Sequence, residues 1–323
     1  MKLSKLITGL ALVAGLAVPV SGGARAEGTA VSVWGGYFHT LAPEVEGFSN
    51  GAVPGRPPLF NHFTPDADDG GFFGASVSVP LDPGALLFGN VELYFEGQVT
   101  ERDKGTDTSV NFGFIPLADG FVATFGDTSA LSARLERERY EFGANLSLPA
   151  RPGGLLPFGL VVTPFGGFAT EDAQSRVSRG VAFSQTNSDI DWWFLGVLVG
   201  TEYTLPLGVG FDLVVGGAGG IYAYDADADF DTTSNVGAAR SASDTDSDVG
   251  FRARASVALR TTLGEGVQVS VFGGLDYWSD LPYSKLPDPS AFVPQQSPAH
   301  IATDDVLDLK AGIRLTMFLD GLM

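Results

Sequence analysis

The strongest constraint on the fold is a strict alternation of side chains near the end of the chain. Every second residue from Leu307 to Leu319 is apolar, and the positions between them include Asp308, Lys310 and Arg314. Successive side chains of a β-strand point to opposite faces, whereas a helix would scatter these apolar residues around its axis. The segment is much longer than the strands of about five or six residues that are usual in soluble sheets. It therefore predicts a long strand with one apolar face, close in length to a tilted membrane strand.

Further segments repeat this alternation, in the ranges 91–98, 249–260 and 267–277. In another segment Trp193 and Tyr203 share one face, with apolar residues between them. Ten residues at about 3.3 Å each, tilted by about 40°, project to about 25 Å, which is the height of the apolar band between the aromatic girdles of a membrane barrel. We expect Trp193, Tyr203 and Tyr277 to be interface aromatics.

The whole pattern predicts an all-β protein, a transmembrane antiparallel up-and-down β-barrel of about ten strands. The strands are expected at 30–39, 71–80, 86–100, 130–148, 156–170, 190–205, 209–224, 248–263, 266–279 and 304–319. Tight turns alternate with long loops, and the long loops are expected at 40–70, 101–129, 171–189, 225–247 and 280–303. The count becomes twelve if 111–116 and 121–125 form a hairpin in the wall rather than above it. The stretch 205–224 is apolar enough for a helix, but Pro206 and its glycines favour a strand.

The start of the chain has the organisation of a secretory signal peptide. Lys2 and Lys5 precede an apolar stretch from Leu6 to Val20, and Ala24-Arg25-Ala26 is a small-x-small cleavage site. We expect residues 1–26 to be removed and residues 27–323 to form a single barrel domain.

Charge and cysteine content exclude several classes of function. The formal net charge is −19, and loss of the leader, which holds three bases and no acid, makes it more negative. An acidic chain without a basic run does not bind nucleic acid. The absence of cysteine excludes disulfides, thiolate catalysis and cysteine-based metal sites.

The last strand carries a recognisable assembly pattern: Lys310, Gly312, then Leu315, Met317 and Phe318. It resembles the signal read by the barrel assembly machinery of Gram-negative bacteria, although that signal usually ends on an aromatic residue and here five residues follow Phe318. In architecture, residues 30–319 resemble Gram-negative outer-membrane β-barrel proteins, including small porins, and no narrower family is indicated. The resemblance implies an outer-membrane location, short periplasmic turns, long extracellular loops, and contact with membrane lipid and lipopolysaccharide.

The face opposite the apolar one would line the lumen and carries both signs of charge. The lumen-facing candidates are Glu92, Glu96, Glu202, Asp212, Arg252, Arg254, Arg260, Lys310 and Arg314. One hypothesis is a porin-like barrel in which these charges select small solutes or ions. The alternative is a closed structural or surface-recognition barrel, in which they pair across a narrow interior and the external loops carry the function.

An enzyme is not expected, and no cofactor is implied. The histidines are His39, His62 and His300. If barrel closure brought His39 and His300 together near Asp304 and Asp305, they would form a hydrolase site at the rim. No known hydrolase motif supports this hypothesis.

Two acidic runs are weak calcium candidates because closely spaced carboxylates can supply several oxygen ligands. Both runs lack the glycine and the distal glutamate of the complete calcium-loop pattern. A hydrated acidic loop is the simpler interpretation. The residues are Asp225, Asp227, Asp229, Asp231, Asp244, Asp246 and Asp248.

Overall fold

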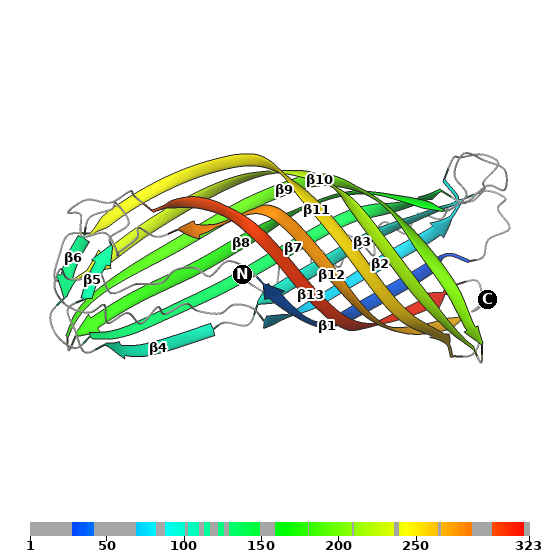
Figure 1. The fold of residues 1–323 in the computed structure, drawn as a ribbon, viewed down its shortest axis with the longest axis horizontal. Coiled ribbons are helices and arrows are strands. Elements are labelled where there is room, and N and C mark those ends of the chain that lie inside the picture. Colours follow the sequence, from blue (N-terminus) through cyan, green and yellow to red (C-terminus); the bar gives the residue numbers. More distant parts are fainter. Residues whose placement is uncertain are drawn as a thin grey trace.

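In the computed structural model, ten strands close into an antiparallel up-and-down barrel (Figure 1). The structure describes residues 28–41, 69–81, 88–100, 103–109, 113–116, 122–125, 129–148, 159–179, 181–208, 210–235, 239–263, 266–285 and 299–319. The strands of the wall are β1 (Ala30–Leu41), β2 (Asp69–Pro80), β3 (Asn90–Thr100), β7 (Ser129–Leu148), β8 (Leu160–Arg179), β9 (Ala182–Gly208), β10 (Phe211–Ser234), β11 (Arg240–Thr262), β12 (Val267–Lys285) and β13 (His300–Phe318). The expected barrel class and strand number are confirmed.

Neighbouring strands pair in sequence order, and two further ladders close the ring. The first and last strands pair from Ala30 opposite Phe318 to Leu41 opposite Leu307. The second closing ladder joins β3 to β7, where Glu96 lies opposite Glu141. The chain between them forms β4 (Asp103–Ser109), which pairs with the outer part of β7, and the hairpin of β5 (Gly113–Pro116) and β6 (Val122–Phe125). Because β5 and β6 form a sheet of their own, the wall keeps ten strands.

The structure corrects two of the expected long loops, 171–189 and 225–247, which are largely strand. The inward residues of β10 continue as Ala226, Ala228 and Phe230, which are buried, whereas the outward residues become aspartates. The alternation therefore persists, but its outward face is no longer apolar. Expected loops 40–70 and 280–303 lie mostly outside the described residues, as does the expected leader 1–26.

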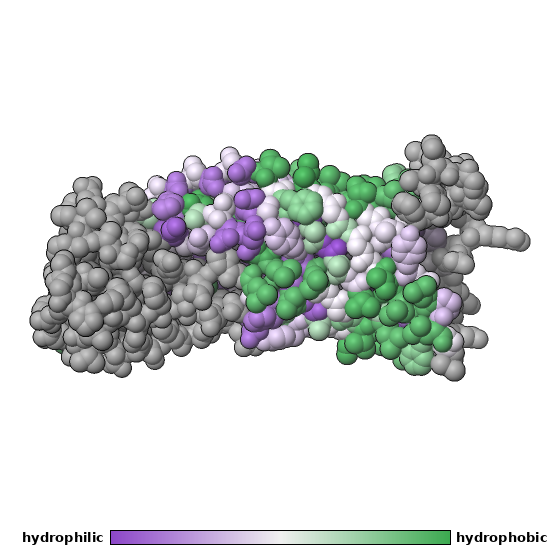
Figure 2. Space-filling view, viewed as in Figure 1, coloured by the Kyte–Doolittle hydropathy of each residue, from purple (hydrophilic) through white to green (hydrophobic). Residues whose placement is uncertain are grey.

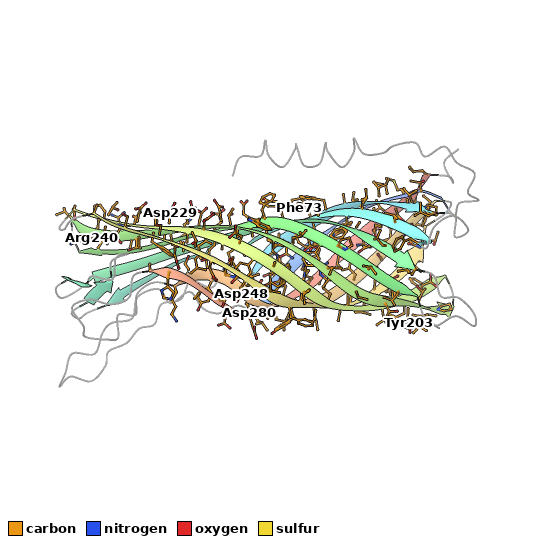
Figure 3. All side chains as sticks on the ribbon, turned by 90° about the horizontal axis from the view of Figure 1, so that it is seen from above. Phe73, Tyr203, Asp229, Arg240, Asp248 and Asp280 are labelled. Atoms are coloured by element: carbon orange, nitrogen blue, oxygen red, sulfur yellow. The ribbon has the colours of Figure 1, made fainter. Side chains whose placement is uncertain are left out.

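The exterior has an apolar zone and a polar zone. Exposed apolar residues cover the half of the barrel nearer the tight turns, and hydrophilic residues gather toward the other end (Figure 2). Tyr203 lies near the tight-turn end, and Asp229 and Arg240 lie toward the opposite end (Figure 3). At the turn between β9 and β10, Gly208 and Gly210 have φ of 81° and 83°, a backbone conformation that glycine adopts without strain. Among the described residues, no helix has the length and apolar character needed to cross a membrane.

Five strands continue beyond the closed ring as an outer extension. It comprises 129–137 of β7, 170–179 of β8, 182–191 of β9, 225–234 of β10 and 240–251 of β11. The ladder between β11 and β12 ends where Arg252 lies opposite Trp278. Beyond that point β12 and β13 pair only with each other among the described residues, and the orange end of β12 stops short of the ends of β10 and β11 (Figure 1).

Candidate functional site in the barrel lumen

A cluster of ion pairs occupies the centre of the lumen. Arg252 is fully buried and donates from Nε and Nη2 to both carboxylate oxygens of Asp276, at 2.9 and 2.8 Å. It also lies 2.7 Å from Glu141 across the barrel. Arg254 contacts the same two acids, Glu141 at 2.9 Å and Asp276 at 3.2 Å. Tyr94 donates to Glu141 at 2.6 Å. These contacts connect β3, β7, β11 and β12 across the interior.

Two further ion pairs complete this cluster, which we call the central layer. Lys310 lies 2.6 Å from Glu96, which also accepts a hydrogen bond from the Trp34 indole at 3.2 Å. Arg139 pairs with Asp308, and Thr40 donates to Asp308 at 2.7 Å. The layer thus contains four acids and four bases, which balance in formal charge: Glu96, Glu141, Asp276 and Asp308 against Arg139, Arg252, Arg254 and Lys310.

Aromatic side chains fill the space beside these charges. Trp278 is fully buried, and Phe165, Phe194 and Tyr222 pack against it edge to face. The Arg252 guanidinium lies 3.5 Å from the centre of the Trp278 ring, close enough for a cation–π contact. Charges in such a setting are stabilised only when they are paired and hydrogen-bonded. Packed side chains rather than open water therefore surround Arg252, Asp276 and Asp308, whereas the Arg254 side chain is 28% exposed.

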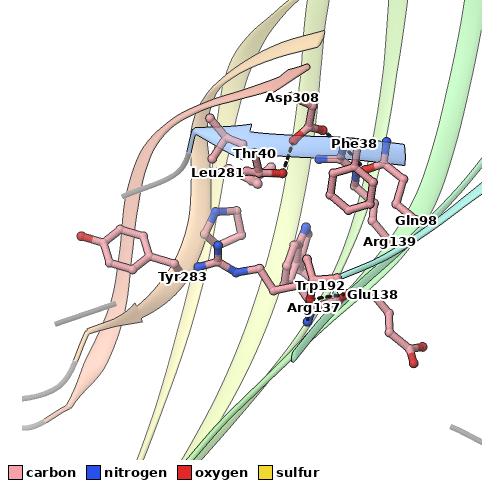
Figure 4. A pocket seen from close by; sticks show the side chains of 13 residues that line it. Phe38, Thr40, Gln98, Arg137, Glu138, Arg139, Trp192, Leu281, Tyr283 and Asp308 are labelled. Carbon is pink, nitrogen blue, oxygen red and sulfur yellow. Dashed lines mark hydrogen bonds and ion pairs between the residues drawn. The ribbon is translucent and has the colours of Figure 1, made fainter. Parts of the chain in front are cut away.

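Cavities lie on both sides of the central layer. The outer one is small, about 50 Å³, and Phe38, Trp192, Arg139 and Asp308 border it together with Leu281, Pro282 and Tyr283 (Figure 4). The other is larger, about 490 Å³, and we call it the vestibule. Its wall includes Glu92, Glu202 and Arg254, and small inward residues leave the space open: Gly200, Gly216, Ala218 and Ser256.

The predicted lumen candidates divide between the central layer and the vestibule end. Glu96, Arg252, Arg254 and Lys310 belong to the layer. Glu92 accepts hydrogen bonds from Ser76 at 2.6 Å and Asn145 at 2.9 Å. The remaining four lie toward the tight turns: Glu202 on the vestibule wall, the pair of Asp212 and Arg260 at 3.3 Å, and Arg314 stacked 4.5 Å over Trp34.

Sequence reasoning missed four residues of the layer: Arg139, Glu141, Asp276 and Asp308. In β7, residues 136–139 are charged on both faces, which hides the inward positions. Asp276 and Asp308 did carry a signal, since both are acids between outward apolar residues. This alternation marks both residues as lumen-facing.

The other predicted residues occupy separate places. Trp193 and Tyr203, which we expect to be interface aromatics, are each 52% exposed on the outer surface, and Trp193 donates to Asp225 at 3.1 Å. Phe251 and Tyr277 pack together with ring centres 6.5 Å apart. The assembly-signal residues all lie on β13, where Leu315 and Met317 are exposed and pair opposite Val33 and Val31.

The acidic runs lie on strands and do not converge. Asp225, Asp227, Asp229 and Asp231 are exposed on the outside of β10, whereas Tyr224 of the inner face donates to Asp246. Side chains two apart on a strand are about 7 Å from each other, so they splay rather than surround an ion. Within the described ranges, no three acids or histidines are arranged to hold a metal ion. Burial and the neighbouring Asp172 and Asp191 raise the pKa of Asp189 on the same outer surface.

The register separates the two described histidines. His39 lies opposite Leu309, whereas His300 lies opposite Lys285, nine positions further along β13. The hypothetical rim site near Asp304 and Asp305 is therefore not formed by these two histidines, and His62 lies outside the described residues. His39 instead contacts Asp69 at 2.9 Å. Hydrogen bonds from Tyr37 and then His39 hold the pKa of the Asp69 carboxyl below its ordinary value.

Comparison with known proteins shows no family for this chain. No family model and no curated protein matches the chain. Among solved structures, the outer membrane protease OmpT of Escherichia coli is 7% identical, with 93% of this chain and 99% of that chain covered and a TM-score of 0.42. A Pseudomonas aeruginosa FadL homologue is 7% identical, with 90% of each chain covered and a TM-score of 0.24. The Pseudomonas putida toluene transporter TodX is 6% identical, with 91% of each chain covered and a TM-score of 0.27. The chain is similar to outer-membrane β-barrel proteins in fold.

Proposed function

We propose that the protein is an outer-membrane β-barrel of a Gram-negative bacterium, closed to passive flow at rest, whose outer extension is its working surface. The apolar zone between Trp193 and Tyr203 supports the membrane position, because it has the height and aromatic borders of a barrel's lipid-facing band. The tight turns then face the periplasm, and the outer extension stands above the membrane.

The central layer is the observation that carries the closed state. A constitutive porin needs water along its lumen, and wide aqueous channels occur in barrels of about 16 strands. Here Arg252 is fully buried at mid-lumen, and the charges that would select ions neutralise one another. A partner that binds at the outer extension, such as lipopolysaccharide, would contact its exposed aspartates.

A second candidate function is regulated passage of small solutes or ions. The layer is flanked by cavities on both sides, so a rearrangement of its ion pairs would join the outer cavity to the vestibule. In this case the lumen charges act as a gate rather than as a permanent filter.

Single-channel recording of the refolded mature protein in a planar bilayer tests the proposal. We expect wild type to insert and remain silent. Arg254→Glu places a third acid beside Glu141 and Asp276, and like charges repel. It should produce stable, cation-selective steps. Arg260→Glu, outside the layer, is the matched control and should stay silent. Steady wild-type steps would overturn the closed state, and regulated steps that appear only with voltage or a ligand would favour the second function.

A further inference from the structure

The ends of β12 and β13 form a two-stranded ribbon that leaves the wall. This tip consists of 281–285 of β12 and 300–304 of β13, which pair with each other. On one side the ladder to β11 stops at Arg252 and Trp278. On the other side the ladder to β1 stops at Leu307. Among the described residues, the tip therefore has no backbone ladder to the rest of the barrel.

A local irregularity marks the point where the ribbon turns. The register between β12 and β13 shifts between Trp278 and Leu281, and Ser279 and Asp280 fall in the gap. Asp280 has φ of 56°, a conformation that is uncommon for a residue with a side chain. Bulges of this kind bend a strand away from its sheet.

The bend carries the tip onto the inner face of the outer extension. Ser284 is 1% exposed, its Oγ lies 2.5 Å from that of Ser188 on β9, and its backbone N–H donates to Glu171 of β8 at 3.0 Å. The Ile301 N–H donates to Asp244 of β11 at 2.9 Å. Tyr283 packs near Leu135 of β7. The tip thus lies against the inner face of the outer extension and is held there by side chains.

The tip also forms the roof of the outer cavity. Leu281, Pro282 and Tyr283 border it opposite Arg139 and Asp308 of the central layer (Figure 4). Trp192 lines the same cavity, and its buried indole N–H has no hydrogen-bond partner. A buried donor without a partner is costly, so water or a polar solute that enters this cavity would be stabilised there.

We propose that the tip is a hinged lid over the outer cavity, turning at Ser279 and Asp280 while the closed ring stays intact. An isolated two-stranded ribbon is marginally stable in water, so its contacts with the outer extension must hold the lid in place. The fully buried Glu171 is its main fastening, because it pairs with Arg137 at 2.6 Å and accepts from Ser284. Opening exposes the outer cavity to the exterior without breaking the central layer.

Thiol labelling of the refolded full barrel in vesicles tests the lid, because the chain contains no native cysteine. Ser284→Cys and Ser76→Cys are matched, since each serine is 1% exposed, but Ser76 lies on β2 within the closed ring. With an impermeant maleimide we expect Ser284→Cys to react at least about tenfold faster, because local openings cost far less than global unfolding. Equal protection of the two would overturn the lid.

Two added changes separate lid motion from general loosening. Glu171→Gln in the Ser284→Cys background should raise the labelling rate at least threefold, whereas Glu136→Gln, at the Arg134 pair, should leave it unchanged. Ser188→Cys with Ser284→Cys should form a disulfide that stops labelling until it is reduced. No effect of Glu171→Gln, or equal effects of both glutamine variants, would contradict the proposed fastening. These rates do not depend on conduction, so failure of the lid is distinguishable from failure of the proposed function.

Discussion

At the scale of single residues, Arg252 illustrates how the lumen holds charge. Its guanidinium is fully buried, stacks on Trp278, and contacts both Asp276 and Glu141. A buried charge cluster adds little net stability over apolar packing, but removal of one partner leaves the others uncompensated.

We therefore expect Arg252→Met to lower the free energy of unfolding by about 3–5 kcal/mol. Arg260→Met removes a half-exposed pair with Asp212 and should cost about 1 kcal/mol or less. Urea unfolding of both variants in lipid vesicles measures the difference. Equal losses would show that the central layer is no more tightly coupled than the pair of Asp212 and Arg260.

The hydrogen bonds that Asp69 accepts predict an effect of pH on stability. Tyr37 and His39 hydrogen-bond the charged form of Asp69 and lower its pKa. The stabilisation is present above the unfolded-state pKa and is lost as pH falls through the lower, folded value. Tyr37→Phe removes the largest contribution, so a carboxyl NMR titration should show the Asp69 pKa move upward toward its ordinary value. An unchanged titration would contradict this assignment.

At the scale of elements, β10 shows what the sequence could and could not predict. From Phe211 to Tyr224 its outward residues are small or apolar, and the strand was expected. Beyond Tyr224 the alternation continues with outward aspartates, and without an apolar outward face the sequence predicts a loop there. The tip of β12 and β13 had no such signal, since its seat on β8 and β9 depends on contacts distant in sequence.

The boundary between the apolar zone and the outer extension predicts that the free-energy cost of introducing a charge depends on its position along the strand. Val199 is 49% exposed in the middle of the apolar zone, whereas Asp227 lies on the outward face beyond Trp193. Val199→Arg should destabilise the inserted barrel by about 2–4 kcal/mol, and Asp227→Arg by about 1 kcal/mol or less. Folding titrations in lipid vesicles measure both. Similar costs at the two sites would place the membrane boundary elsewhere.

At the scale of the whole molecule, the chain combines a closed ring of ten strands with an outer extension that continues from five of them, β7 to β11. The ring contains the charge-balanced central layer, the vestibule lies on the tight-turn side of this layer, and the tip borders the outer cavity. Ring closure and strand number followed from the sequence. The pairing partners across the lumen did not, because they depend on the stagger of the strands.

Sided labelling of Ser256→Cys tests closure of the lumen most directly. Ser256 lines the vestibule, on the tight-turn side of the central layer. In vesicles of uniform orientation, a small impermeant thiol reagent should modify this cysteine from the tight-turn side and leave it intact from the side of the outer extension. Modification at comparable rates from both sides would mean that the lumen is open, and would contradict the closed barrel proposed here.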